Sequence, residues 1–259
     1  MTVKPQNTRQ APDDGSKQMP HTPSKRLLKN CDLGEQPDTH IDAAVMPHID
    51  QANIACGGHA GDAQSMKRVL QLAKTHNVAI GAHPSYPDRA NFGRQSLNLP
   101  WAELEASLTD QVRQLTQIAA SQGLPLQHIK PHGALYLDMM RSETLFARLL
   151  DWADHRFPGV PLMAQWLPDT AAFHDLAQAR DLPIIWEAFA DRRYQPNGQL
   201  APRHEPDCLH TDAQGIIDQA WLFFEQTQDP HHPMQAHSLC FHSDNPASVE
   251  ALIALGQTA

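Results

Sequence analysis

Short apolar runs alternate with longer amphipathic segments from residue 27 to the end of the chain. Apolar runs of about five residues are typical of buried strands, whereas apolar positions spaced three or four apart are typical of helices. Their regular alternation favours βαβ units around a parallel sheet. The predicted strands are Leu27–Cys31, Ala52–Cys56, Val78–Ala82, Leu126–Lys130, Val160–Ala164, Pro183–Trp186 and His237–Phe241.

Helical periodicity follows each of these strands. Within the predicted helix Asp62–His76, for example, Met66, Val69, Leu70 and Ala73 form an apolar stripe that would pack on the sheet. Seven βα units in about 230 residues fit a closed barrel more easily than an open doubly wound sheet. We therefore predict an α/β fold, a seven-stranded TIM-like (β/α) barrel of the glycoside hydrolase and deacetylase type, as a single catalytic domain over residues 27–259.

Residues 1–26 differ from the rest of the chain in composition. They are polar, basic and proline-containing, with hardly an apolar side chain to bury. Folding could not offset the entropy cost of ordering them, so we predict a disordered extension. The segment has no apolar core of the kind found in signal peptides, and export is therefore not expected.

Composition narrows the range of partners and compartments. The net charge of −9 provides no basic field for nucleic acid, and no apolar run approaches the ~20 residues that span a bilayer. The four cysteines are far apart and form no C-x-x-C pair, which favours a reducing environment. We expect a cytoplasmic protein that acts on a small molecule without membrane or nucleic-acid partners.

Ionisable or polar side chains follow six of the seven predicted strands. A histidine after a single strand is most often a loop or capping residue, but repetition in successive units is what an active site built from βα loops requires. The side chains in question are Asn30, Asp32 and Glu35, then His59 and Asp62, His83, Lys130 and His132, Glu187, Asp191, Arg192 and Arg193, and finally His242, Ser243 and Asp244.

Two kinds of chemistry suit these side chains. Carboxylates beside cations suit an anionic substrate and general-base catalysis. Alternatively, His59, His83, His132 and His242 with Asp32 and Asp244 could hold a divalent metal of unknown identity, brought together only by the fold. The segment 57–62 could cradle an anion at a helix N-terminus, or it could be a tight turn with Asp62 as the cap.

Several long motifs resemble the LamB/YcsF family in order and spacing, and the resemblance covers residues 27–259. These motifs are NCDLGE (30–35), QANIACGGHAGD (51–62), VAIGAHPSYPDRANFGR (78–94), LQHIKPHGALY (126–136), EAFADRRYQPNGQLAPR (187–203) and CFHSDNP (240–246).

The resemblance implies the A subunit of an ATP-dependent 5-oxoprolinase, which works with subunits B and C to convert 5-oxoproline to glutamate. The chain has no Walker A spacing, so ATP would be shared with the partner subunits. We expect Asp32 to be the general base, with Lys130 and His132 stabilising the oxyanion or departing phosphate. The expected substrate-binding residues are Asn30, Asn53, His59, His83, Glu187, Asp191, Arg192, Arg203, His242 and Asp244.

The chain departs from the family pattern in three places. Leu28 stands where family members carry an Asp, and Lys29 follows it; the stretch after Glu35 is shortened; and Ser243 replaces a glycine. We expect these changes to alter the rim near the first and last strands. Two other functions remain open, a stand-alone metal-dependent deacetylase or amidohydrolase and a non-catalytic subunit that only binds the substrate.

Overall fold

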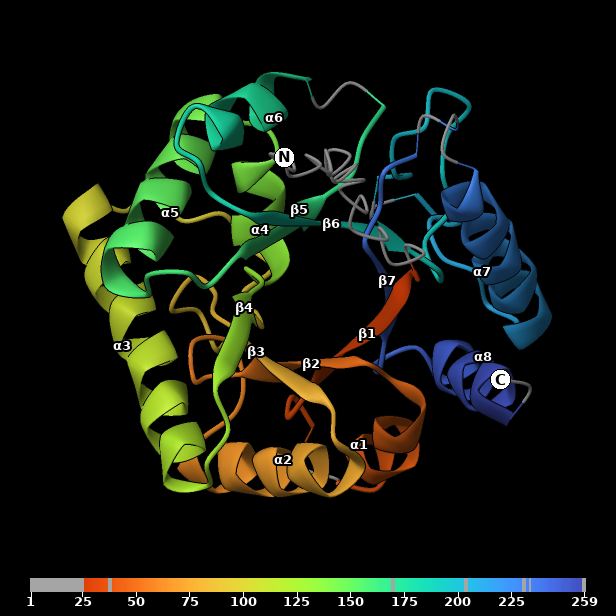
Figure 1. The fold of residues 1–259 in the computed structure, drawn as a ribbon, viewed down its shortest axis with the longest axis horizontal. Coiled ribbons are helices and arrows are strands. Elements are labelled where there is room, and N and C mark those ends of the chain that lie inside the picture. The colour runs from red at the N-terminus through yellow and green to blue at the C-terminus, as the bar shows by residue number, and fades with distance from the viewer. Residues whose placement is uncertain are drawn as a thin grey trace, which may run out of the picture.

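A closed barrel of seven parallel strands forms the centre of the computed structural model, which describes residues 26–36, 39–168, 171–202, 205–229, 232 and 234–257. The strands follow one another in chain order, and β1 closes the ring by pairing with β7 (Figure 1). They are β1 Leu28–Leu33, β2 Gln51–Ala55, β3 Ala79–His83, β4 Leu126–Ile129, β5 Leu162–Gln165, β6 Ile184–Phe189 and β7 Ser238–His242. The predicted barrel is confirmed, and each predicted strand overlaps an observed one.

Helices surround the barrel on its outer side (Figure 1). The side chain of Asp62 accepts hydrogen bonds from Gln64 N and Ser65 N, so it caps the helix that the sequence predicted from this point. The helices are α1 His40–Val45, η1 Met46–His48, α2 Ala63–His76, α3 Trp101–Ser121, α4 Gly133–Met139, α5 Glu143–Arg156, α6 Ala171–Gln178, α7 Ala213–Gln228 and α8 Pro246–Gln257.

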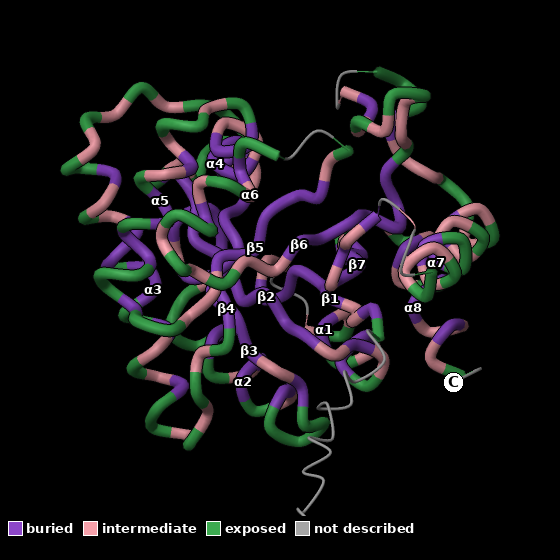
Figure 2. Tube along the Cα trace, turned by 45° about the horizontal axis from the view of Figure 1, so that its top comes forward, coloured by how far each residue is buried: buried purple, intermediate pink, exposed green. Residues whose placement is uncertain are grey.

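Side chains of the strands alternate between the helical layer and the barrel interior. On β1, Cys31 and Leu33 belong to the buried apolar core, whereas Asn30 and Asp32 form hydrogen bonds to residues of other strands. Burial is highest along the strands, and exposed positions lie on the outer faces of the helices (Figure 2). The core therefore lies between sheet and helices, and the interior of the barrel remains available for polar side chains.

Five strands end later than the sequence predicted. β1 continues to Leu33, β3 to His83, β5 to Gln165, β6 to Phe189 and β7 to His242, so that Asp32, His83, Glu187 and His242 are strand residues rather than the loop residues that follow. An apolar run does not reveal these polar strand residues, whose side chains find polar partners in the fold. The backbone pairing between the strands includes them.

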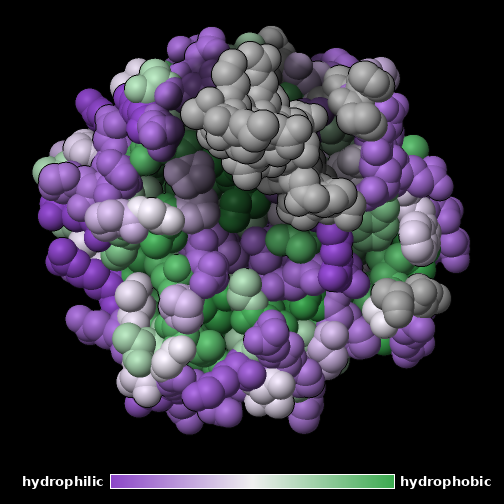
Figure 3. All heavy atoms as spheres, viewed as in Figure 1, coloured by the Kyte–Doolittle hydropathy of each residue, from purple (hydrophilic) through white to green (hydrophobic). Residues whose placement is uncertain are grey.

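In the described parts of the chain, none of the helices is long and apolar enough to cross a bilayer. Hydrophilic side chains dominate the edge of the face seen in Figure 3, and hydrophobic ones gather nearer its centre. The predicted extension 1–26 falls outside the described residues except for Arg26, so its disorder stays a prediction.

Candidate active site

The interior of the barrel is filled by a connected set of buried polar side chains. Asn30 donates to Ser238 Oγ at 2.7 Å, and Asn53 donates to Asn30 Oδ1 and to Asp32 Oδ1, each at 2.8 Å. Ser238 in turn donates to Gln51 Oε1 at 2.7 Å. Apolar branched side chains usually fill such an interior. Here a hydrogen-bonded network fixes the positions of groups on β1, β2 and β7 instead.

His128 and Gly81 complete this layer on the neighbouring strands. His128 Nε2 lies 2.6 Å from Asn53 Oδ1, and burial lowers the pKa of His128 to about 3, so the ring is neutral and donates this hydrogen bond. Gly81 is paired with both His128 and Asn53 across the sheet. A Cβ atom at position 81 would collide with the His128 ring, so only glycine leaves room for it.

Lys130 places a buried positive charge above this layer. Its ammonium lies 3.0 Å from Asp32 Oδ1 and 3.1 Å from Glu187 Oε2, with Asn30 Oδ1 at 3.3 Å and Cys240 Sγ at 3.1 Å. Burial opposes the charge, but Asp32, Cys240 and Glu187 outweigh it and hold the pKa of Lys130 well above its usual value. An ammonium has three protons, and these acceptors use all of them.

Asp32 is held as a carboxylate at the mouth of the barrel. Burial would raise its pKa, yet the nearby His83 and Lys130 hold the pKa of Asp32 well below its usual value. Oδ1 is occupied by Lys130 and Asn53, whereas Oδ2 lies 3.4 Å from His83 Nε2 and 3.9 Å from His242 Nε2. One oxygen is therefore fixed by the barrel interior, and the other faces the imidazoles.

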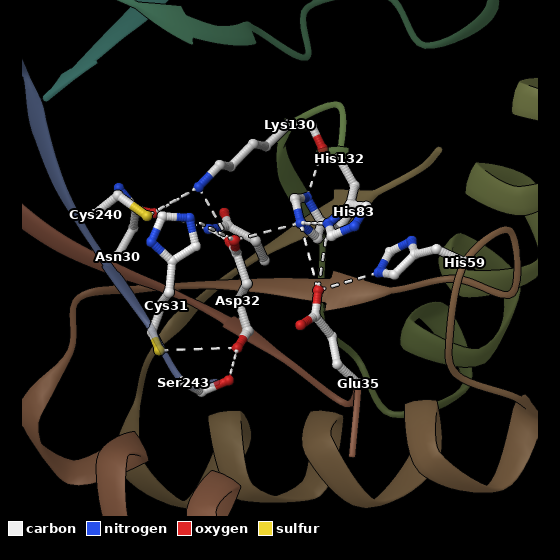
Figure 4. A network of polar contacts seen from close by, with 12 residues as sticks. Asn30, Cys31, Asp32, Glu35, His59, His83, Lys130, His132, Cys240 and Ser243 are labelled. Atoms are coloured by element: carbon white, nitrogen blue, oxygen red, sulfur yellow. Dashed lines mark hydrogen bonds and ion pairs between the residues drawn. The ribbon is translucent and has the colours of Figure 1, made fainter. Parts of the chain in front are cut away.

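Three histidines converge on Glu35 next to Asp32 (Figure 4). Glu35 Oε1 lies 3.0 Å from His59 Nε2, 3.4 Å from His132 Nδ1 and 3.7 Å from His83 Nε2. Burial raises the pKa of Glu35, lowers that of His59 to about 2 and lowers that of His132 well below its usual range. Neutral imidazoles beside a carboxylate are a set of donors that suits a divalent metal.

His242 is paired with a second buried carboxylate. His242 Nδ1 lies 2.9 Å from Asp191 Oδ1, and the backbone N–H of His242 donates to Asp191 Oδ2 at 3.3 Å. The Asp191 carboxylate accepts a hydrogen bond from Nδ1–H of His242. The other ring nitrogen, Nε2, is therefore directed toward Asp32. This Asp–His arrangement is suited to proton transfer, because the carboxylate orients the ring and stabilises its protonated form.

A cavity opens above these groups and collects most of the predicted site residues. Its lining includes the predicted residues Asp32, His83, Lys130, His132, Arg192, His242 and Asp244, together with Glu35, Arg94, Tyr136 and Phe189. Arg94 Nη2 contacts Asp244 Oδ2 at 2.6 Å, and 44% of the Arg94 side chain is exposed. Strand-end reasoning missed Arg94 because it lies eleven positions beyond His83, in the loop before α3.

The other predicted residues lie behind the cavity. Asn30, Asn53 and Glu187 are in the barrel interior, His59 is behind Glu35 and Asp191 is behind His242, so none of these lines the cavity. Arg203 is outside the described residues. The predicted metal set also divides, since His59, His83 and His132 meet Glu35, whereas Asp32 and His242 group with Cys240.

The segment 57–62 is a tight turn between β2 and α2. Gly57 N donates to Ala60 O and Arg89 donates to the carbonyls of Gly57 and Gly61, which favours the turn interpretation. Cys31, Cys56 and Cys240, which stand at or next to strands, are buried.

The departures from the family motifs have different consequences. Leu28 and Lys29 stand at the start of β1, before Asn30, and neither lines the cavity. Ser243, by contrast, is buried and its hydroxyl donates to Asp32 O at 2.6 Å (Figure 4). A glycine could not form this bond, so the substitution adds a contact to the strand that carries Asp32.

The chain is similar to known proteins over most of its length. A 5-oxoprolinase A subunit of Pseudomonas aeruginosa is 41% identical over 240 residues, covering 88% of this chain and 94% of its own length. The 5-oxoprolinase A subunit of Vibrio cholerae is 40% identical over 238 residues, covering 88% and 96%. The crystal structure of a lactam utilization protein from Thermus thermophilus superposes with a TM-score of 0.78 at 33% identity, covering 90% of this chain and 96% of that one.

The family model itself spans nearly all of the barrel. It matches residues 29–258, a range that begins within β1 and extends beyond the end of α8 and so includes every strand end that contributes to the cavity. Together with relatives that align over almost their full lengths, this match shows that the chain belongs to the LamB/YcsF family.

Proposed function

We propose that this protein is the A subunit of an ATP-dependent 5-oxoprolinase and opens the lactam ring of 5-oxo-L-proline to give L-glutamate. The relatives named as 5-oxoprolinase A subunits align over almost their whole length, and the Thermus structure is named a lactam utilization protein. The observation that carries the proposal is the cavity in which an ionised Asp32 faces His242, because ring opening requires a proton acceptor and a proton donor on one substrate.

ATP and partner subunits are part of the same proposal. A lactam is stabilised by resonance, and phosphorylation of its oxygen would make the ring carbon a better electrophile for water. The chain has no Walker A spacing, so we assign nucleotide binding largely to the partner subunits B and C. The relatives carry the name of one subunit among several, which supports an assembly of this kind. A cytoplasmic location would supply the nucleotide.

Asp32 is the proposed general base. Its Oδ1 is held by Lys130 and Asn53, which fixes the direction of Oδ2 toward the cavity side. In the proposal, Oδ2 removes a proton from the attacking water. The depressed pKa keeps Asp32 ionised at neutral pH, so the base is always in its active form.

Lys130 fits a positioning role better than the oxyanion role expected from the sequence. Its protons are taken up by Asp32, Glu187, Asn30 and Cys240, so an oxyanion would have to displace one of these acceptors. In the proposal, Lys130 keeps Asp32 ionised. His132 also lines the cavity, and its role toward the oxyanion or departing phosphate stays a prediction.

His242 is the proposed proton donor to the departing nitrogen. Asp191 holds its Nδ1, so Nε2 is the atom that exchanges a proton with the substrate. Arg192 is one of the expected substrate-binding residues and lines the cavity, but it also donates to Ala201 O at 2.7 Å and thereby holds its own loop. We therefore assign the carboxylate to Arg94, whose partner Asp244 also lines the cavity.

Glutamate release from 5-oxoproline and ATP tests the proposal. The chain should be active with subunits B and C and inactive alone. Asp32→Asn should lower kcat/KM by about 100-fold or more, the usual contribution of a general base. Asp110→Asn, an exposed position on α3, should match the wild type. Full activity of Asp32→Asn in the reconstituted enzyme would contradict the assignment of the base.

A metal-dependent deacetylase or amidohydrolase is the second candidate, because Glu35 and three histidines form a group that could hold a divalent ion. Amide hydrolysis by the chain alone, without ATP, abolished by a chelator and restored by Zn²⁺, would favour it. A third candidate is a non-catalytic binding subunit. Calorimetry would support that role if a variant without both Asp32 and His132 still bound 5-oxoproline and the complex kept its activity.

A further inference from the structure

Two histidines in the cavity wall, His83 and His132, each form a hydrogen bond to a main-chain carbonyl through one ring nitrogen. His83 Nδ1 lies 2.7 Å from Lys130 O, and His132 Nε2 lies 3.0 Å from Phe92 O. A carbonyl oxygen can only accept, so both of these ring nitrogens carry protons. The opposite ring nitrogens, His83 Nε2 and His132 Nδ1, are then the atoms that remain to bind a ligand or an ion.

These two nitrogens face each other at 3.0 Å. Glu35 Oε1, which is also an acceptor, lies 3.4 Å from His132 Nδ1 and 3.7 Å from His83 Nε2. Two imidazole nitrogens and a carboxylate oxygen at these separations are a set of ligands that one divalent metal ion can bind together.

From this geometry we propose that Glu35, His83 and His132 form a three-ligand centre for a divalent first-row transition metal such as Zn²⁺. With metal–ligand bonds of about 2.0–2.1 Å, tetrahedral ligand atoms lie about 3.3 Å apart, which matches the observed spacing. The Lys130 and Phe92 carbonyls fix the outer nitrogens of the two rings, as second-shell acceptors do in metalloproteins.

His59 has a different role in this centre. Its ring is stacked on that of His132, with centroids 3.6 Å apart and planes inclined by only 5°. Lone pairs lie in the ring planes, so those of His59 and His132 run in parallel planes and do not meet at one ion. His59 Nε2 instead lies 3.0 Å from Glu35 Oε1. We assign His59 as a positioning residue that donates to Glu35 and fixes this ligand.

The remaining coordination positions face the active-site cavity. Glu35, His83 and His132 all line it, whereas His59 does not. Three protein ligands with an open position are typical of catalytic rather than structural zinc. Two imidazoles favour Zn²⁺, Co²⁺ or Fe²⁺ over Mg²⁺ and Ca²⁺, which prefer oxygen ligands. Metal binding at this centre does not require the proposed oxoprolinase activity to be correct.

Metal binding by the whole chain, produced without a polyhistidine tag and stripped with a chelator, tests this centre. Calorimetry with ZnCl₂ should give one site per chain, at least about 100-fold tighter than with MgCl₂. CoCl₂ should produce visible absorption bands of a low-coordinate site. Thermal unfolding should shift upward with Zn²⁺ because the ion binds only the folded chain.

Variants separate the ligands from their surroundings. His83→Gln and Glu35→Gln should lose the tight site and the cobalt bands, while circular dichroism reports that they fold. His59→Gln should keep one site, weakened about 10- to 100-fold as for other second-shell changes. His155→Gln, exposed on α5, should bind like the wild type.

Two outcomes would overturn the centre. One is the absence of stoichiometric binding by the folded wild-type chain, and the other is unchanged binding by a folded His83→Gln variant. Activity is measured separately from metal binding. If the complex is inactive but this chain binds one Zn²⁺, the proposed function is contradicted and the metal centre stands. If the complex is active but this chain binds no Zn²⁺, the metal centre is contradicted and the proposed function stands.

Discussion

Replacement of Lys130 by methionine should destabilise the barrel strongly, because it removes a positive charge that contacts two buried carboxylates. Lys130, Asp32 and Glu187 have side chains 3%, 6% and 0% exposed, with N–O distances of 3.0 and 3.1 Å. Removing one partner from a buried ion pair costs about 3–5 kcal/mol, since the remaining charge is buried and uncompensated. That loss is a large part of a total stability of about 5–15 kcal/mol.

Urea unfolding followed by circular dichroism measures the decrease in the free energy of unfolding, and two further variants serve as comparisons. Arg156→Met breaks a pair of similar length, 2.8 Å to Glu105, but the side chains there are 38% and 26% exposed. It should cost about 0–1 kcal/mol, because solvent screens the charges. The double variant Lys130→Met/Glu187→Gln should be more stable than Lys130→Met, since one buried charge is removed with the cation.

The reasoning would be refuted if Lys130→Met cost no more than Arg156→Met. It would also be refuted if the double variant were less stable than Lys130→Met, because the buried carboxylate would then not be the source of the loss. Equal slopes of the unfolding curves among these variants would show that the midpoints report stability rather than a change in the unfolded state.

Three other predictions concern single positions. Gly81→Ala should fold poorly because its Cβ would meet the His128 ring, and the double variant Gly81→Ala/His128→Ala should be the more stable of the two by urea unfolding. Phe146→Ala should cost about 3–5 kcal/mol by the same assay, since this ring is fully buried in the core; a loss under about 1 kcal/mol would contradict its packing. Asp191→Asn should lower kcat of the reconstituted enzyme more than it changes KM, because it misorients His242 without touching substrate; equal kcat would exclude the dyad.

Sequence patterns alone were enough to predict the fold class and most of the wall of the cavity. Apolar runs at regular intervals located all seven strands, because each strand packs against the surrounding helices and must be apolar on that face. The rule that parallel barrels place their chemistry at the carboxyl ends of strands then identified Asp32, His83, Lys130 and His242. Both inferences depend on the order of apolar and polar residues within short segments, which can be read directly from the sequence.

What each of these side chains does became clear only from the folded barrel. Lys130, which directly follows β4, contacts Asp32 of β1 and Glu187 of β6, and the large separation of these residues in the sequence carries no information on distance. Glu35 gave no local sign that it would meet three histidines, and Arg192 gave none that main-chain carbonyls would engage it. Hydrogen-bond direction, which fixes the tautomers of His83 and His132, depends on where backbone carbonyls of other segments lie, and only the closed barrel sets those positions.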